Sequence, residues 1–219
     1  MSVVVFDLDG TLVDSLPDIH AAALATLAEA GLPPVGPEQT RSFIGDGMPK
    51  LVERLMRATG ADMERHAALL DRFLAHYGAA PAARSTLYPA VAETLAALAK
   101  NHALGVCTNK PVGPARAVLS HFGLLEHMGT VVGGDSLGVI KPDPAPLARA
   151  IADLGGGPAL YVGDSEVDGR TAEAAGVPFA LFTGGYRRAP VDEIPHDDAF
   201  GAFAALPGIV ARLLLPGAA

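Results

Sequence analysis

Residues 3–12 read Val3-Val4-Val5-Phe6-Asp7-Leu8-Asp9-Gly10-Thr11-Leu12, an apolar run that ends in an acidic, glycine-containing turn. A short run of β-branched and aromatic residues is typical of a strand that is buried on both faces, as in a parallel sheet. Two carboxylates that directly follow such a strand would repel each other unless a cation lies between them. The stretch therefore predicts a buried strand with a charged site at its carboxyl end.

The rest of the chain divides into a helical block and an alternating block. A helix is expected over residues 16–30, and the pattern stays helical from about residue 38 to residue 83. After Pro89, helices and strands alternate. The expected helices are 90–100, 114–122, 144–154, 168–175 and 203–215, and the expected strands are 103–108, 130–133, 159–163 and 178–182.

This order predicts an α/β fold, a Rossmann-like parallel sheet with helices on both faces, plus a small all-helical cap inserted after the first strand. The last helix is expected to pack on the sheet. We expect the catalytic core to comprise residues 1–14 and 84–219 and the cap to comprise residues 15–83.

Composition excludes several classes of function. The 219 residues are half apolar, and 16 basic against 24 acidic residues give a net charge of −8, with no basic stripe for nucleic acid. A single cysteine, Cys107, cannot form an internal disulfide, which fits a reducing cytoplasm. The start of the chain lacks the features of a signal peptide, and no apolar run is long enough to cross a membrane. We expect a cytoplasmic monomer or homodimer that binds neither nucleic acid nor a membrane.

Polar side chains follow the other predicted strands as well. Thr108 and Asn109 come after the second strand, Lys141 lies in a loop after the third, and Asp164 and Asp168 follow the fourth. Ligands of open parallel sheets bind outside the carboxyl ends of the strands. We therefore expect these groups to converge on the site that begins at Asp7.

The acidic residues suit a magnesium site. Mg²⁺ prefers oxygen ligands and keeps part of its shell for water and substrate phosphate. Asp164 would add a third carboxylate to Asp7 and Asp9, and Asp168, four residues further on, would orient these ligands. Such an ion would shield a phosphate so that a carboxylate could approach it and form an acyl phosphate.

The other residues suit phosphoryl transfer. Asp9 is placed to protonate the leaving oxygen and then to deprotonate water. Gly10 would let the backbone approach the phosphate, and Thr108 would offer a hydroxyl to a phosphoryl oxygen. Lys141 would supply a fixed cation that offsets developing charge and keeps Asp7 ionised.

Together these segments resemble the haloacid dehalogenase superfamily. Its first motif, Asp-x-Asp-Gly-Thr, is similar to residues 7–11, and its second, a Thr or Ser after a strand, is similar to Thr108. Its lysine motif resembles Lys141-Pro142, and its Gly-Asp-x-x-x-Asp motif resembles residues 163–168. The resemblance implies that Asp7 is the nucleophile and Asp9 the acid/base. It also implies that Asp7, the carbonyl oxygen of Asp9 and Asp164 bind Mg²⁺, and that the helical insert is a C1 cap.

Shorter segments resemble the phosphoglycolate phosphatases of this superfamily. They are Asp14-Ser15, Gly31-Leu32-Pro33-Pro34, Ile44-Gly45-x-Gly47, Leu51-Val52-x-Arg54 and Thr108-Asn109-Lys110, with a departure at Met48-Pro49. The resemblance implies a phosphoric monoester hydrolase that acts on a small phosphorylated metabolite, with 2-phosphoglycolate as the expected substrate. The candidate substrate-binding residues are Gly10, Thr11, Asn109 and Gly45, together with Arg41 and Lys50 from the cap; Arg54 is a further cap candidate.

Other interpretations remain open at this point. A phosphosugar phosphatase, or a phosphosugar mutase similar to β-phosphoglucomutase, would share the core residues. A non-catalytic binding module on the same fold is a third possibility. Single residues also have structural interpretations: Asp164 and Asp168 could serve only the start of a helix, and Arg41, Lys50 and Arg54 are each more often solvated helix residues.

Overall fold

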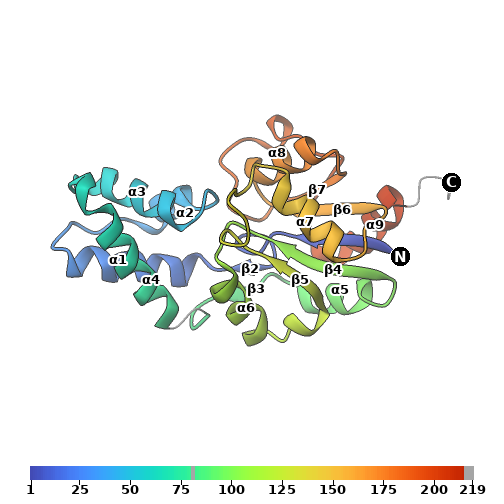
Figure 1. Cartoon of the computed structure of the whole chain (residues 1–219), viewed down its shortest axis with the longest axis horizontal. Coiled ribbons are helices and arrows are strands. Elements are labelled where there is room, and N and C mark those ends of the chain that lie inside the picture. The colour runs from blue at the N-terminus through green and yellow to red at the C-terminus, as the bar shows by residue number, and fades with distance from the viewer. Residues whose placement is uncertain (80–81, 215–219) are drawn as a thin grey trace.

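A six-stranded parallel sheet forms the centre of the larger part of the molecule (Figure 1). The structure, a computed structural model, describes residues 1–79 and 82–214. The strands are β1 (Ser2–Phe6), β4 (His102–Cys107), β5 (Met128–Val132), β6 (Ala159–Gly163), β7 (Phe179–Phe182) and β8 (Asp198–Phe200), in the order β5-β4-β1-β6-β7-β8. Strand β1 lies between β4 and β6, which explains why Val3 to Phe6 are all apolar and fully buried.

Helices cover both faces of this sheet. Helices α5 (Val91–Leu98), α6 (Val112–His121) and α9 (Leu206–Leu214) pack on the face that carries Val4 and Phe6. Helices α7 (Ala145–Asp153) and α8 (Glu166–Ala175) pack on the face that carries Val3 and Val5. Successive side chains of a strand point to opposite faces, so one apolar tetrapeptide supplies both cores. The predicted α/β fold with helices on both faces is confirmed, and the last helix packs on the sheet as expected.

Four helices form a second unit beside the sheet, at the left of Figure 1. This helical unit consists of α1 (Leu16–Glu29), α2 (Pro37–Phe43), α3 (Met48–Thr59) and α4 (His66–Ala79). Its apolar side chains, among them Leu51, Leu55 and Phe73, form a cluster of their own. Among the described residues, Tyr186 is the one member of that cluster that comes from the sheet side, where it follows β7.

The chain passes between the two units at a small antiparallel pair of strands. Strand β2 (Val13–Asp14) pairs with β3 (Thr86–Leu87). The buried carboxylate of Asp18, in the first turn of α1, accepts hydrogen bonds from the backbone N–H groups of Arg84 and Ser85 and from the Ser85 hydroxyl. The segment that enters the helical unit and the segment that leaves it are therefore both held at the start of α1.

The observed elements differ from the predicted ones mainly at their ends. Helix α8 begins two residues earlier than predicted, and the last predicted helix divides into a 3-10 turn (Phe203–Ala205) and α9. Strands β2, β3 and β8 were not predicted, because two or three residues are too few to show an alternating pattern. The helical prediction for Ala80, Pro81 and Leu215 lies outside the described residues. Among the described helices, none is long and apolar enough to cross a membrane.

Candidate active site

The turn after β1 places its polar groups by tight backbone hydrogen bonding. The Asp7 N–H donates to the carbonyl of Val162 on β6 (2.8 Å), and the Leu8 carbonyl accepts from the N–H groups of Leu12 (3.0 Å) and Val13 (3.1 Å). Gly10 has φ of +89°, and a Cβ atom there would lie 2.6 Å from Oδ2 of Asp164. Only glycine fits this position, so the turn can approach the loop after β6 closely.

Lys141 joins the turn after β1 to the start of α8. Its buried Nζ lies 2.9 Å from Oδ1 of Asp7, 2.7 Å from Oδ1 of Asp168 and 2.8 Å from the hydroxyl oxygen of Tyr161. Burial alone would lower the pKa of Lys141, but the charges of Asp168 and then Asp7 outweigh it, so this pKa is raised. The ammonium group stays charged and partly neutralises the two carboxylates.

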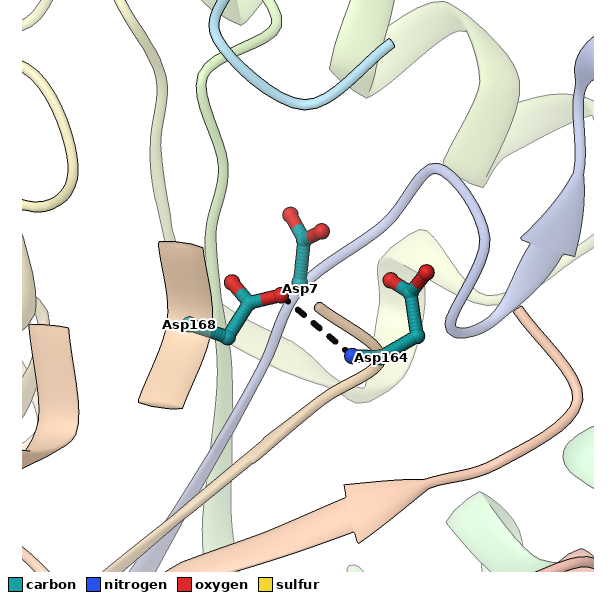
Figure 2. A group of neighbouring side chains, drawn as sticks. All are labelled: Asp7, Asp164 and Asp168. Atoms are coloured by element: carbon teal, nitrogen blue, oxygen red, sulfur yellow. Dashed lines mark hydrogen bonds between the residues drawn. The ribbon is translucent and has the colours of Figure 1, made fainter. Parts of the chain in front are cut away.

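Three buried carboxylates meet at this edge of the sheet. One oxygen from each of Asp7, Asp164 and Asp168 lies within 4.8 Å of the others, a spacing that could hold a metal ion. Figure 2 shows the Asp7 and Asp164 side chains pointing to the same side, while Asp168 accepts a hydrogen bond from the Asp164 backbone N–H. The predicted convergence of residues from separate strands is therefore present in the structure.

The electrostatics of the three carboxylates differ. Burial raises the pKa of Asp7 from 3.8 to about 6, although Lys141 opposes the rise. Burial, followed by the charges of Asp168 and Asp7, raises the pKa of Asp164 well above its usual value. Burial would also raise the pKa of Asp168, but the Lys141 ammonium outweighs it and holds this pKa low. The negative charges of Asp7 and Asp164 are therefore not fully compensated by nearby cations, whereas that of Asp168 is compensated by Lys141.

Asp168 has a structural role in addition to its contact with Lys141. Its Oδ2 accepts from the backbone N–H and the hydroxyl of Ser165. Ser165 is the N-cap of α8 and Asp168 is the third residue of that helix, so the two residues form a capping box. The structural interpretation of Asp168 as a helix-start carboxylate therefore holds alongside its contact with the site. For Asp164 the interpretation as the helix N-cap is wrong, because Ser165 occupies that position.

Two groups that face Asp164 fix its carboxylate. The Thr11 hydroxyl donates to Oδ1 (2.9 Å), and the Tyr186 backbone N–H donates to Oδ2 (2.5 Å). Thr11 is fully buried, so its hydroxyl supports Asp164 in this structure. The prediction that Thr11 contacts substrate stays a prediction.

The segment after β4 supports its neighbours through side-chain contacts. The Asn109 side-chain amide donates to the carbonyls of Gly45 and Lys141 (both 3.0 Å), and its Oδ1 accepts from the Lys141 N–H (2.9 Å). Thr108 is buried at the edge of the cavity described below. Lys110 donates to both carboxylate oxygens of Asp9, at 2.7 and 2.9 Å. Burial would lower the pKa of Lys110, but the charge of Asp9 outweighs it and raises this pKa.

A cavity lies between these strand ends and the helical unit. It is lined by Asp7, Asp9, Ile19, Ile44, Gly45, Gly47, Met48, Leu51, Thr108, Asn109, Lys110 and Lys141. The helical unit contributes glycines and apolar side chains, and the sheet side contributes the charges. Gly45 lines this cavity, and the prediction that it contacts substrate stays a prediction.

The predicted cations of the helical unit do not line this cavity. Arg41 donates to the Gly185 carbonyl and stacks over the ring of Tyr186, outside the cavity. Lys50 pairs with Glu53 at 2.8 Å on the surface of α3. Arg54 pairs with Asp46 at 2.5 Å and donates to the Phe43 carbonyl. The structure therefore brings the core candidates together and leaves Arg41, Lys50 and Arg54 apart from them.

Four further residues complete the site, and the sequence interpretation gave none of them a role: Tyr77, Lys110, Tyr161 and Tyr186. Lys110 was quoted only as part of Thr108-Asn109-Lys110, although a basic residue beside a strand end is itself a signal. Tyrosines in an apolar strand, an apolar helix and a glycine-rich loop give no comparable signal, because they are equally common in cores.

Comparison with known proteins places this geometry in a family. The haloacid dehalogenase-like hydrolases match residues 4–182. The chain belongs to this family. A phosphoglycolate phosphatase of Cereibacter sphaeroides is 52% identical over 217 residues, which cover 98% of this chain and all of that protein. A phosphoglycolate phosphatase of Rhodospirillum rubrum is 47% identical over 212 residues, covering 93% of this chain and 88% of that protein.

A solved structure agrees with these relatives. The crystal structure of a predicted phosphoglycolate phosphatase from Haemophilus somnus matches this hydrolase with a TM-score of 0.90 and 33% identity, covering 95% of this chain and 97% of that one. The predicted membership of the haloacid dehalogenase superfamily and the similarity to phosphoglycolate phosphatases are confirmed. The prediction of an enzyme of the phosphoric monoester hydrolase class is confirmed as well.

Proposed function

We propose that this hydrolase is a magnesium-dependent phosphatase that cleaves 2-phosphoglycolate through a phosphorylated Asp7. The observation that carries the proposal is the buried group of Asp7, Asp164 and Lys141 at the strand ends. The names of the full-length relatives support the substrate. We include in the proposal a cap role for residues 15–83 on a core of residues 1–14 and 84–219, a cytoplasmic location, and a monomer or homodimer.

The residues present fit a divalent cation. Oδ1 of Asp7 is buried and has no well-aligned hydrogen bond, although the Lys141 Nζ lies 2.9 Å away as a charge partner. Hard oxygen donors of this kind are what Mg²⁺ prefers. In the proposal, Asp7, the Asp9 carbonyl oxygen and Asp164 hold the ion, and Asp168 orients the site through Lys141. When bound, the ion shields the phosphate's negative charge so that a carboxylate can approach it.

The proposed reaction has two steps. An oxygen of Asp7 bonds to phosphorus, the ester P–O bond breaks with its electron pair on the alcohol oxygen, and Asp9 donates a proton to that oxygen. Water then attacks phosphorus while Asp9 accepts a proton, which releases inorganic phosphate and restores Asp7. Thr108 would donate to a phosphoryl oxygen, and the Lys141 ammonium would offset the growing charge.

The cavity favours a small substrate. Ile44, Met48 and Leu51 enclose it from the helical unit, so little room is left beyond a phosphate and a short organic group. Gly45 and Gly47 bring backbone close to this space, and Asn109 fixes the Gly45 loop over it. The contacts of Arg41 and Lys50 make them poor candidates for holding a substrate carboxylate in this arrangement.

A panel of phosphate esters tests the proposal. The purified protein is assayed with Mg²⁺ against 2-phosphoglycolate, hexose phosphates and 4-nitrophenyl phosphate, and the esters are ranked by kcat/KM. We expect 2-phosphoglycolate to rank first and EDTA to abolish turnover. A hexose phosphate in first place would identify a phosphosugar phosphatase, and formation of a sugar phosphate isomer would identify a mutase. Either result would overturn the proposed substrate.

A further inference from the structure

Lys110 lies at the boundary between the sheet and the helical unit. It follows β4, its side chain is fully buried, and its Nζ donates to both oxygens of Asp9 (2.7 and 2.9 Å) and to the Tyr77 hydroxyl. Tyr77 belongs to α4 of the helical unit. An ammonium group has three donors, and all three are used by these two residues.

Tyr77 is itself held firmly in the helical unit. Its side chain is 1% exposed, and its ring stacks on Phe73 with centroids 6.2 Å apart. The Lys110 Nζ lies 4.5 Å from the centroid of the Tyr77 ring, within the range of a cation–π contact. The position of the ammonium group thus depends on where α4 lies relative to the sheet.

We propose that Lys110, fixed by Tyr77, is a positioning residue that holds Asp9 in the orientation needed to protonate the leaving oxygen. The inference rests on the proposed function, because it concerns the acid in that reaction. In this structure Lys110 contacts both Asp9 oxygens; when one of them carries the proton, Lys110 gives up that contact and keeps the other oxygen in place. As the proton passes to the leaving oxygen, the new negative charge forms beside an ammonium group already in place. The acid is therefore aligned only while the helical unit lies against the sheet as it does here.

A different role for Lys110, binding a carboxylate of the substrate, is less consistent with its contacts. Its Nζ would have to give up Asp9 or Tyr77 to reach a ligand. The two roles also differ in their dependence on substrate. A positioning role depends on how much the leaving group needs a proton, whereas a binding role depends on whether the substrate has a carboxylate.

The test compares Lys110→Met and Tyr77→Phe with three esters. These are 2-phosphoglycolate, ethyl phosphate, which lacks the carboxylate but has an equally basic leaving group, and 4-nitrophenyl phosphate, whose leaving group needs little protonation. We measure kcat/KM, which reports the steps up to release of the alcohol. For Lys110→Met we expect a loss of about 100-fold or more with both alkyl esters, and a much smaller loss with 4-nitrophenyl phosphate. For Tyr77→Phe, kcat/KM should also fall more with the two alkyl esters than with 4-nitrophenyl phosphate, but each loss should be smaller than for Lys110→Met. Lys100→Met, at an exposed position, is the matched control.

Other outcomes would overturn the inference. Equal losses with all three esters would show a purely structural role, and a loss confined to 2-phosphoglycolate would show a carboxylate-binding role. If Lys110→Met does not fold, Tyr77→Phe decides, since it removes one hydroxyl. Wild-type protein that turns over none of the three esters would instead contradict the proposed function.

Discussion

At Asp7, burial and charge act in opposite directions. Removal from water raises its pKa to about 6, and Lys141 lies beside it but does not fully offset that cost. A group whose charged form is destabilised in the fold is typical of functional sites. The same group would be expected to gain most from a cation.

Replacing Asp7 with asparagine should lower the catalytic activity without lowering the stability of the fold. Asp7→Asn removes the nucleophilic oxygen, so turnover should fall by more than about 10³-fold. Because it also removes a poorly compensated buried charge, the midpoint of thermal unfolding should stay the same or rise. Activity assays and calorimetry on the same samples check both parts. Substantial remaining activity would exclude Asp7 as the nucleophile.

The stability of the metal-free protein should depend on pH through Asp7. Its folded pKa of about 6 lies above the unfolded value of 3.8, so the fold binds more protons between these values. Stability should therefore fall as pH rises from about 4 to about 6. The opposite contribution of Asp168, whose pKa is lowered, lies below that range. Differential scanning calorimetry of wild type and Asp7→Asn checks this, and the slope should be smaller in the variant.

Addition of Mg²⁺ should reverse this loss. Ions at about 100 times their dissociation constant would stabilise the fold by about 2.7 kcal/mol. The increase in unfolding temperature should be larger at pH 7.5 than at pH 5, because protons compete for the same carboxylates. An increase that is the same at both values would argue against binding by Asp7 and Asp164.

Individual residues show what the sequence could and could not predict. Asp7, Asp164 and Lys141 were predictable because each directly follows a strand or lies in a loop at the same sheet edge. Arg41 and Lys50 were not, because their helix positions do not reveal the pairing of Arg41 with Gly185 or of Lys50 with Glu53. Contacts between units far apart in the chain have no local pattern.

Among the elements, the loop after β7 packs closely against the site. A Cβ atom at Gly185 would lie 2.3 Å from both Oδ2 of Asp164 and the Gly10 carbonyl oxygen. Tyr186, the next residue, binds Asp164 through its N–H and reaches Asp14 of β2 through its hydroxyl (2.6 Å). The loop thus connects the candidate metal site to the strand pair between the two units.

Gly185→Ala should therefore disturb the site through backbone movement. We expect a loss of stability of about 2 kcal/mol and weaker Mg²⁺ binding, since Asp164 must shift. Thermal unfolding with and without Mg²⁺ measures both. Gly138→Ala is the control, because a Cβ atom there would have no neighbour within 4 Å. Equal behaviour of the two variants would contradict this account.

The buried strands of the sheet were easier to predict from the sequence than the short strands that connect the two units. Buried strands such as β6 (Ala159–Gly163) have a continuous apolar sequence, and its predicted bounds are the observed ones. The pairing of β2 with β3 depends on where the chain returns after four helices, which local periodicity does not record. The 3-10 turn at Phe203–Ala205 is apolar and directly adjoins the largely apolar α9, so the sequence predicted one helix.

At the scale of the whole molecule, a chain of charges spans the two units. Arg188 of the sheet side pairs with Glu166 at 2.6 Å and with Asp46 of the helical unit at 3.3 Å, and Asp46 also pairs with Arg54 at 2.5 Å. The groups are partly exposed, so the expected contribution is about 1 kcal/mol or less. We expect loss of this contribution to lower the fraction of molecules in which the helical unit lies against the sheet.

Arg188→Ala should raise KM for the substrate about three- to five-fold while the unfolding temperature changes little. High salt should raise KM of the wild type in the same direction and have less effect on the variant. Steady-state kinetics at low and high salt provide the measurement. Arg149→Ala, which removes a pair with Asp153 within α7, is the control. A variant with the same salt dependence as wild type would exclude this contact as a link between the units.

The antiparallel pair of β2 and β3 has an evolutionary consequence. Val13 lies directly opposite Leu87, so the chain leaves for the four helices and returns at neighbouring positions. Within residues 1–79 and 82–214, the two apolar clusters of the sheet contain no residue of α1 to α4. An ancestral gene could thus have gained, lost or exchanged the whole insertion as one module, with a tight hairpin turn sufficient to close the gap. New substrate preferences would then arise by grafting, while the carboxylates at the strand ends were inherited.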